Sequence, residues 1–480
     1  MELNPEYIKD HIAEIGVKEG LVLLKELINS SSDSSIRNKA LEYFGIFERG
    51  KNFAFLEQLF LSDEDENIAL LAGKILKNKY IAHKKLTRLL EYILHNVENV
   101  EQKIFSIEAL ISIDSLKARK MVIDYVKSLS RSIFKEKAIK IPPELLNHNY
   151  NAIIPQNLID ICINLILHQY YVNSCGYLST LRRGMIVSLV CESSNLQGIN
   201  EIVGLHFLYN LEYLTIQRNH LKEITQLKHL ANLKALNLSH NDIKKIENLY
   251  SLITLEELNL SNNKIKRIEN LELLSKLKKL FLNSNDITHI ENLGSLTSLE
   301  VLEINRNKIS KIENLRKLDK LERLNLSFNR IEKMEGLTQL QNLMWLYLND
   351  NVIGQIEDLS TLQKLKGLNL SNNNIEKLSS LENLQNLKKI ELSNNKIWKL
   401  EGLQNLVELQ ELYLDNNSIK KLEGLEGLNN LIILHLGRNA IKEFSNESVE
   451  HLKNLNFIFL NENPLDQKSF SEYQKRVKFP

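Results

Sequence analysis

The 480-residue sequence lacks the features of several large protein classes. Cysteine is scarce: Cys162, Cys175 and Cys191 form no CxxC pair, so neither a zinc site nor a disulfide framework is expected. The formal net charge is +1, so the basic excess typical of a direct nucleic-acid binder is missing. There is no run of 18 apolar residues and no apolar signal-peptide core at the charged N-terminus. We therefore expect a cytoplasmic protein with reduced thiols, no membrane span and no direct nucleic-acid binding.

Motifs that carry catalysis or hold cofactors are also missing. The sequence has no P-loop, no HExxH and no GxSxG motif, and its histidines do not cluster with carboxylates at metal-ligand spacing. The acidic segment SDEDEN (62–67) resembles a calcium loop but lacks the glycine and the final glutamate of such a loop. It predicts a helix start instead, because carboxylates offset the helix dipole there. We expect no enzyme activity, no cofactor, no metal and no small-molecule substrate.

An internal repeat dominates the second part of the chain. The unit L-x-x-L-x-L-x-x-N-x-I-x-x-I-x-x-L-x-x-L-x-x begins at Leu211 and recurs every 22 residues up to Leu431, with a twelfth start at Leu455. The ninth position is asparagine in all twelve units, from Asn219 to Asn463. A fixed period of this length predicts a leucine-rich-repeat solenoid, an α/β fold in which stacked coils bury a continuous core.

Each part of the unit has a physical role. Side chains alternate along a strand, so positions 4 and 6 point inward while positions 3, 5 and 7 face outward on a concave parallel sheet. The remaining ten or so residues of the convex side leave room for a short 3₁₀ turn but no long helix. The asparagine amide is expected to satisfy buried backbone groups at the turn and to pass hydrogen bonds to the next coil.

The ends of the array are predicted to be caps. Residues 181–210 are expected to form an atypical N-terminal capping repeat with a strand at Met185–Val190, and residues 464–480 a short C-terminal cap. The twelve regular repeats fill residues 211–463.

Residues 1–180 lose the 22-residue period and take on helical apolar spacing, which predicts an all-α domain. Polar clusters with cap-type residues precede helices that carry a small residue in the middle, namely Ala40, Ala72 and Ala109. Such small residues let paired helices pack closely, and the pattern resembles HEAT-like helical repeats. A linker is expected at 141–155, with helix resuming at Gln156.

Aromatic and acidic side chains at the outward strand positions are the candidate binding residues. Exposed aromatic residues on a sheet face are costly without a partner and are enriched in binding hot spots. The alternative is that aromatic residues simply suit strands and cover one another. The candidate set for binding a protein partner on the concave face is Phe281, Glu303, Trp345, Tyr347, Glu411, Tyr413 and His435.

Residues 189–480, about 60% of the chain, resemble the leucine-rich-repeat regulatory subunit of protein phosphatase 1, the regulatory subunit 7 type. The resemblance lies in the I-x-x-I-E-N/G-L-x-x-L half of the unit and in the C-terminal segment NPLDQKSFSEYQKRVKFP, which is similar to that family's cap. The resemblance implies phosphatase binding through acidic and aromatic residues on the concave strands. Phe281, Glu303, Glu411 and Tyr413 fit that pattern, whereas Asn259 and Asn325 depart from it, and the helical front end is not part of that family.

The functional hypothesis is a non-enzymatic scaffold or adaptor that binds a protein on the concave face. The alternative is a regulatory subunit of an enzyme such as a protein phosphatase or a small GTPase. Structural support within a larger assembly also stays open. Four Asn-Leu-Ser sequons share one strand position, and glycans there would obstruct one face of the solenoid, which favours the cytoplasm: Asn237, Asn259, Asn325 and Asn369.

Overall fold

The computed structural model describes residues 4–134, 151, 154 and 156–476. Its chain divides into two compact units, the first made of residues up to 187 together with 203–208 and the second of residues 188–202 and those from 209 on. The predicted linker at 141–155 lies almost wholly outside the described residues.

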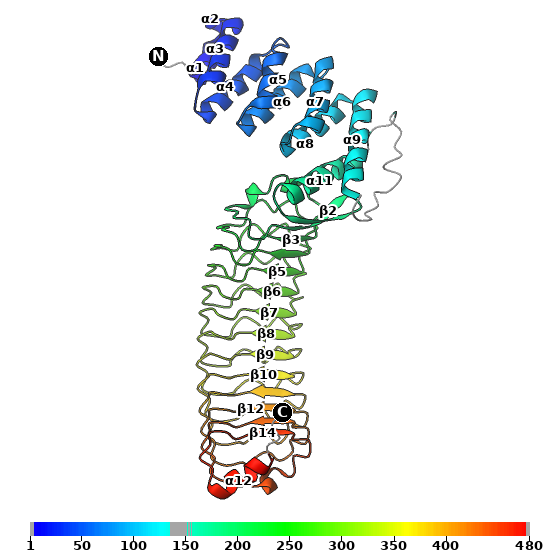
Figure 1. Ribbon diagram of the computed structural model, residues 1–480. Helices are drawn as coiled ribbons and strands as arrows, with labels where there is room; N and C mark the ends of the chain where they lie inside the picture. Colours follow the sequence, from blue (N-terminus) through cyan, green and yellow to red (C-terminus); the bar gives the residue numbers. More distant parts are fainter. Residues whose placement is uncertain (1–3, 135–150, 152–153, 155, 477–480) are drawn as a thin grey trace. The chain divides into compact units, whose positions relative to one another are not determined.

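The first unit is built mainly of helices (Figure 1). Consecutive helices pair as antiparallel neighbours, α3 with α4, α5 with α6 and α7 with α8, which is the helix-pair architecture predicted from the HEAT-like pattern. The helices are α1 (Pro5–Asp10), α2 (Ile12–Ile15), α3 (Val17–Ser30), α4 (Ser34–Phe47), α5 (Phe53–Ser62), α6 (Glu66–Tyr80), α7 (Lys84–Asn96), α8 (Val100–Ile113), α9 (Leu116–Phe134) and α11 (Gln156–Asn173).

The polar clusters start helices as predicted. Asp65 is the N-cap of α6 and accepts hydrogen bonds from the backbone N–H groups of Asn67 and Ile68, so the acidic segment is a helix start. The second helix of each pair carries one of the predicted small residues, and all three are fully buried: Ala40 in α4, Ala72 in α6 and Ala109 in α8. Helix α6 packs against α5 within its pair and against α4 and α8 of the neighbouring pairs, so a small, fully buried residue suits its crowded middle.

Helix α11 begins at Gln156, as predicted. Its polar side chains form hydrogen bonds with the backbone of the last segments of the first unit. The buried Asn164 accepts a hydrogen bond from the backbone N–H of Ile186 at 2.9 Å. The hydroxyl of Tyr171 donates to the carbonyl of Val203 at 2.6 Å. Ile186 belongs to β2 (Met185–Val190), which follows β1 (Leu178–Arg182) and confirms the strand predicted for the capping region.

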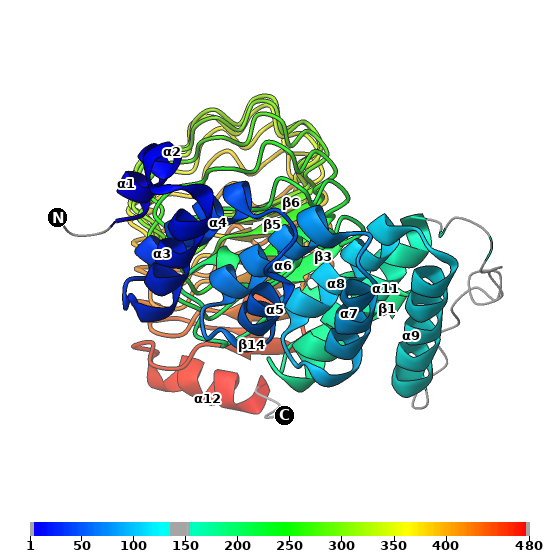
Figure 2. The same cartoon turned by 90° about the horizontal axis from the view of Figure 1, so that it is seen from above.

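The second unit is a parallel-sheet solenoid of about twelve turns (Figures 1 and 2). Its short strands lie side by side in sequence order, and each residue pairs with the residue at the same position of the next repeat, as Trp345 does with Gly367. The strands are β3 (Tyr213–Thr215), β4 (Ala235–Asn237), β5 (Glu257–Asn259), β6 (Lys279–Phe281), β7 (Val301–Glu303), β8 (Arg323–Asn325), β9 (Trp345–Tyr347), β10 (Gly367–Asn369), β11 (Lys389–Glu391), β12 (Glu411–Tyr413), β13 (Ile433–His435) and β14 (Phe457–Phe459).

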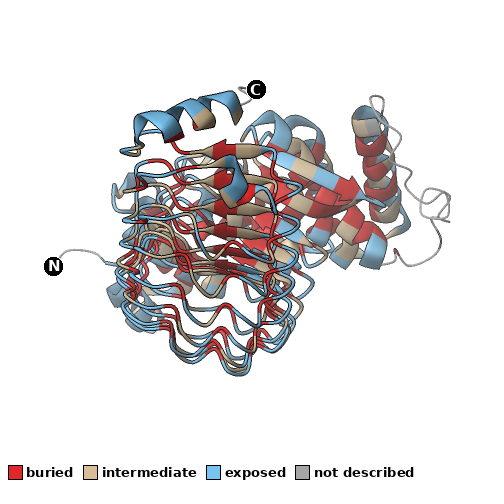
Figure 3. Ribbon diagram, turned by 90° about the horizontal axis from the view of Figure 1, so that it is seen from below, coloured by how far each residue is buried: buried red, intermediate tan, exposed pale blue. Residues whose placement is uncertain are grey.

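The leucines and isoleucines of the repeat fill the inside of the coils. Figure 3 shows buried residues lining the interior and exposed residues on the outside of each coil. The strand residue at position 4, such as Leu346, is buried while its neighbours on both sides reach the surface. On the opposite side of each coil, pairs of hydrogen bonds three residues apart close 3₁₀-type turns, as from Leu252 to Leu249 and from Leu255 to Leu252.

The asparagine ladder works as predicted in satisfying buried backbone groups. In Asn373 the side-chain N–H groups donate to the carbonyls of Leu348 and Leu370 at 3.0 Å, and the side-chain oxygen accepts from the N–H of Ile353 at 3.0 Å. Because Leu348 and Ile353 belong to the preceding repeat, the ladder binds each coil to the one before it rather than to the next. This side chain therefore supports both the turn and the stack.

A helix closes the end of the array. In every inner repeat the N–H at position 6 donates to the following strand, but Leu460 has no following strand. Its N–H donates instead to the hydroxyl of Tyr473 at 2.9 Å, and Tyr473 belongs to α12 (Gln467–Arg476). The ring of Tyr473 also meets Phe444 edge to face. The C-terminal helix thus replaces the missing neighbour of β14.

Candidate functional site

The register of the sheet arranges the outward side chains in two straight rows. The third-position row contains Tyr213, Ala235, Glu257, Lys279, Val301, Arg323, Trp345, Gly367, Lys389, Glu411, Ile433 and Phe457. The fifth-position row contains Thr215, Asn237, Asn259, Phe281, Glu303, Asn325, Tyr347, Asn369, Glu391, Tyr413, His435 and Phe459. We call the surface formed by these rows the strand face.

All seven predicted site residues lie on the strand face, but they form separate groups. Phe281 and Glu303 are partners on β6 and β7, and Trp345 and Tyr347 share β9. The third group combines Glu411 and Tyr413 of β12 with His435 of β13. Strands β9 and β12 are three spacings apart, about 14 Å, so one extended ligand would be needed to touch both aromatic groups.

The carboxylate of Glu303 is occupied within the face. Glu303 is only 7% exposed, and its two oxygens accept hydrogen bonds from Arg323 at 2.5 Å and from the side chain of Asn325 at 2.7 Å. The guanidinium of Arg323 in turn lies 4.8 Å from the ring centre of Tyr347. Glu303 therefore fixes Arg323 against Tyr347 and does not present a free charge.

Trp345 is the most exposed of the predicted residues, at 37%. Its ring lies over the neighbouring strand, because a Cβ atom on Gly367 would come within 2.4 Å of the indole. A glycine at this one place of the third-position row lets the tryptophan lie across the sheet, with part of its surface open to a ligand.

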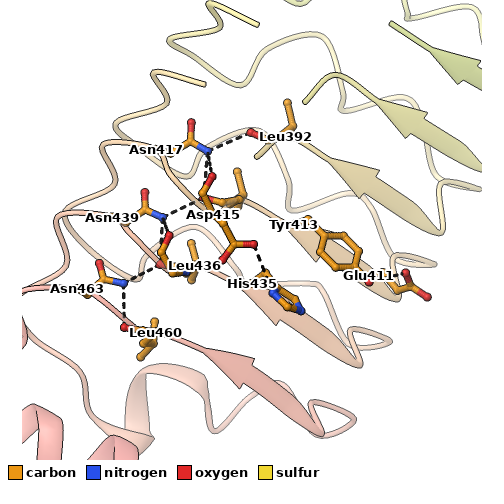
Figure 4. A network of polar contacts seen from close by, with 12 residues as sticks. Leu392, Glu411, Tyr413, Asp415, Asn417, His435, Leu436, Asn439, Leu460 and Asn463 are labelled. Atoms are coloured by element: carbon orange, nitrogen blue, oxygen red, sulfur yellow. Dashed lines mark hydrogen bonds and ion pairs between the residues drawn. The ribbon is translucent and has the colours of Figure 1, made fainter. Parts of the chain in front are cut away.

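An aromatic stack covers the last strands, and Figure 4 draws two of its three rings, those of Tyr413 and His435. The rings of Tyr413 and His435 are 4.8 Å apart, and those of His435 and Phe459 are 4.1 Å apart, both nearly parallel. The Nδ1 atom of His435 lies 3.4 Å from a carboxylate oxygen of Asp415, which fixes the orientation of the imidazole ring. In this stack each ring covers part of its neighbour's face, and the three rings are held one behind the other along the solenoid.

Lys389 and Glu411 complete the third group. The ammonium of Lys389 lies 3.0 Å from Glu391, 3.4 Å from Glu411 and 5.0 Å from the ring centre of Tyr413. Burial lowers the pKa of Lys389, but the attraction of the two carboxylates outweighs it and the pKa lies above its usual value. Burial raises the pKa of the Tyr413 hydroxyl, and the hydrogen bond of 3.0 Å that it donates to Glu411 raises it further. The charges here are paired with one another.

The sequence alone did not point to three residues that shape this face: Arg323, Gly367 and Lys389. Each contacts a side chain of a neighbouring repeat, so the signal that could have found them is a pairing of side chains 20 to 22 residues apart. Phe281, by contrast, was a predicted site residue, but among the described residues its ring contacts no other aromatic ring.

The described residues contain no group of three or more histidine, cysteine or acidic side chains placed to hold a metal ion. Among the helices that the structure describes, none has the length and apolar character needed to cross a membrane. All three cysteines are free thiols.

Family comparisons agree with the geometry. Models described as leucine-rich repeats match residues 231–273, 275–317 and 385–427, residues 298–391, and residues 407–465. The chain is a leucine-rich-repeat protein. These models are general to such repeats and give no support to the resemblance to the phosphatase regulatory subunit in particular. A comparison with curated proteins gives no significant match.

Solved structures show the same fold in leucine-rich-repeat proteins of several kinds. An internalin (InlF) from Listeria monocytogenes is 25% identical, with 74% of this chain and 95% of the internalin covered at a TM-score of 0.57. The APL1 leucine-rich-repeat domain is 23% identical, with coverages of 61% and 77% and a TM-score of 0.54. The TLR13–ssRNA13 complex is 25% identical, with coverages of 57% and 43% and a TM-score of 0.51. Leucine-rich-repeat proteins generally act in protein–protein interaction, and no catalytic family is indicated.

Proposed function

We propose that this leucine-rich-repeat protein is a non-enzymatic scaffold or adaptor that binds a protein partner on the strand face. The observation that carries the proposal is the open aromatic surface of β9 and β12–β14. Trp345 keeps 37% of its surface exposed although a glycine is placed beneath it, and Tyr413, His435 and Phe459 are stacked on an outward face. Preorganised aromatic side chains of this kind lose little entropy on binding.

The test is affinity purification with the wild-type chain and with a Trp345→Ala, Tyr347→Ala, Tyr413→Ala triple variant as baits, followed by mass spectrometry. We expect at least one protein to be retained by the wild type and lost from the variant. The side chains lie on the surface of strands whose core leucines are unchanged, so circular dichroism should show equal folding of both baits. Identical sets of bound proteins would place the binding site outside the strand face and overturn the proposal.

A regulatory role toward an enzyme such as a protein phosphatase or a small GTPase is a second candidate. The acidic–aromatic pair of Glu411 and Tyr413, joined by a hydrogen bond of 3.0 Å, supports it, because the resemblance in the sequence implied residues of these two types. Turnover of a purified phosphatase or GTPase would be measured with the wild type and with Glu411→Gln, Tyr413→Phe. Unchanged turnover with both would count against regulation while leaving partner binding intact.

We also propose a cytoplasmic location. The free thiols support it. The sequon asparagines also support it, because their side chains form hydrogen bonds within the strand face. Asn325 donates to Glu303 at 2.7 Å and Asn369 donates to Glu391 at 2.8 Å, so glycans on either would remove these bonds. Fractionation of the source cells tests this, and a glycosylated form in a secretory fraction would overturn it.

A further inference from the structure

The charged residues that immediately precede the strands follow two different patterns along the solenoid. The second-position row, one residue before the third-position row, reads Glu212, Lys234, Glu256, Lys278, Glu300, Glu322, Met344, Lys366, Lys388, Gln410, Ile432 and Asn456. Acidic and basic residues alternate in this row over the first repeats. Around Met344 the two signs are separated, with two acidic residues before it and two basic residues after it.

The alternating part of the row neutralises itself. Lys234 lies 3.2 Å from Glu212, and Lys278 lies 2.8 Å from Glu256. The pKa of Glu256 is lowered and that of Lys278 raised, in each case first by the hydrogen bond between them. Opposite charges on adjacent strands stabilise a sheet surface, so this part needs no external partner.

The separated part does not neutralise itself. Within residues 156–476, which the structure describes without a gap, Glu300, Glu322, Lys366 and Lys388 take part in no ion pair or side-chain hydrogen bond. Glu300 does lie near enough to Lys278 to raise the pKa of that lysine, but the ion pair of Lys278 is with Glu256. Glu322, Lys366 and Lys388 are exposed. Like charges on neighbouring strands are unfavourable by themselves, so this arrangement costs free energy in the unbound protein.

The change of pattern is centred on β9, the strand of the aromatic pair. Trp345 and Tyr347 are the outward residues of this strand, and the apolar Met344 directly precedes them. Acidic residues stand one and two strands before Met344 in its row, and basic residues one and two strands after it. The charged residues within these strands are paired with one another, Arg323 with Glu303 and Lys389 with Glu391. The surface therefore has an acidic end, an apolar middle and a basic end along the axis of the solenoid.

We propose that strands β7–β11 bind an extended segment of a partner protein in which basic residues, an apolar residue and acidic residues follow one another. The segment lies along the solenoid axis, with its basic end on Glu300 and Glu322, its apolar side chain on Trp345, and its acidic end on Lys366 and Lys388. Four strand spacings separate Glu300 from Lys388, about 19 Å, which an extended peptide spans in about six residue steps. This inference rests on the proposed function and specifies the chemistry of the partner.

The probe is a seven-residue peptide of two arginines, alanine, leucine, alanine and two glutamates, compared with an isomer in which the second arginine and the first glutamate are exchanged. Both peptides have the same composition and net charge, and only the first keeps its charges separated. Binding would be followed by the fluorescence of Trp345 in a Trp398→Phe background. We expect the first peptide to bind about tenfold more tightly at low salt, with the difference shrinking as salt screens the charges.

A double variant tests the origin of the preference. Glu322→Lys with Lys366→Glu turns the separated row into an alternating one at constant net charge, and the tenfold preference should disappear. The matched control, Lys234→Glu with Glu256→Lys, makes the same exchange in the alternating part and should leave the preference unchanged. Equal affinity of the wild type for both peptides, including no binding of either at millimolar concentration, would overturn the inference.

Comparing partner binding by the aromatic triple variant and by the charge variant distinguishes a failure of this inference from a failure of the proposed function. A partner that is lost from the aromatic triple variant but retained by the Glu322→Lys, Lys366→Glu protein would uphold the strand face as a binding site and refute the charge order. A partner retained by both would refute the two together.

Discussion

Removing one asparagine of the ladder should destabilise the array far more than removing its sequence neighbour. Asn373 is 8% exposed, and its side chain makes three hydrogen bonds of 3.0 Å, two as donor to Leu348 and Leu370 and one as acceptor from Ile353, with a longer one of 3.3 Å donated to Ser371. Alanine at this position removes all four and leaves the buried N–H of Ile353 without an acceptor. At about 1 kcal/mol net for each of the three shorter bonds, the free energy of unfolding should fall by about 3 kcal/mol.

The matched control is Asn374→Ala. Asn374 is half-buried, and its side chain forms no hydrogen bond with the residues that the structure describes, so the change should cost less than about 0.5 kcal/mol. Urea unfolding followed by circular dichroism measures both variants. Because repeat arrays can unfold in parts, hydrogen exchange at the amide of Ile353 gives an independent local reading and should accelerate only in Asn373→Ala. Equal stabilities and equal exchange rates in the two variants would refute the role assigned to the ladder.

Three further changes test other contacts. Gly367→Ala places a Cβ atom 2.4 Å from the ring of Trp345 and should displace it, seen as red-shifted emission when the other tryptophan is replaced by phenylalanine; an unchanged spectrum would contradict the packing. Tyr473→Phe leaves the N–H of Leu460 without its acceptor and should cost about 1–2 kcal/mol, with faster exchange confined to the last repeat rather than spread along the array. Asp65→Ala should cost about 1 kcal/mol at neutral pH through loss of the N-cap of α6. Hydrogen bonds, first that from Ser34, lower the pKa of Asp65 in the folded protein, so its stabilisation is present above the unfolded pKa and lost as pH falls through the folded pKa. Wild type and variant should therefore converge in acid, and a constant difference across pH would show that the carboxylate charge is irrelevant.

In the helical unit the sequence predicted helix starts and buried small residues, but not which helices pack together. The cap at Asp65 and the buried positions of Ala40, Ala72 and Ala109 were visible as a polar cluster followed by a small residue. The spacing between these alanines is uneven, 32 and 37 residues, because helix and loop lengths vary from pair to pair. Which helices pack together is therefore decided by the fit of whole apolar faces, and the sequence does not state it.

In the solenoid the sequence by itself determined the position of each strand, the inward leucines, the outward rows and the asparagine ladder. A period of 22 residues that holds from Leu211 to Leu431 allows only one stacking register, because any shift would expose the leucines of every coil. The strand at Met185–Val190 was also predicted, from its own apolar run, although it lies 25 residues and not 22 before its partner strand.

Only the tertiary structure decided how the outward side chains are used. Each of them faces a neighbour on the strand before and on the strand after, and the period does not state which of the two it contacts. Glu303 binds Arg323 and loses its free charge, Trp345 lies over Gly367, and Tyr473 takes the place of a strand beside Leu460. These choices depend on side-chain size and on the charges available nearby, so they appear only when the coils are stacked.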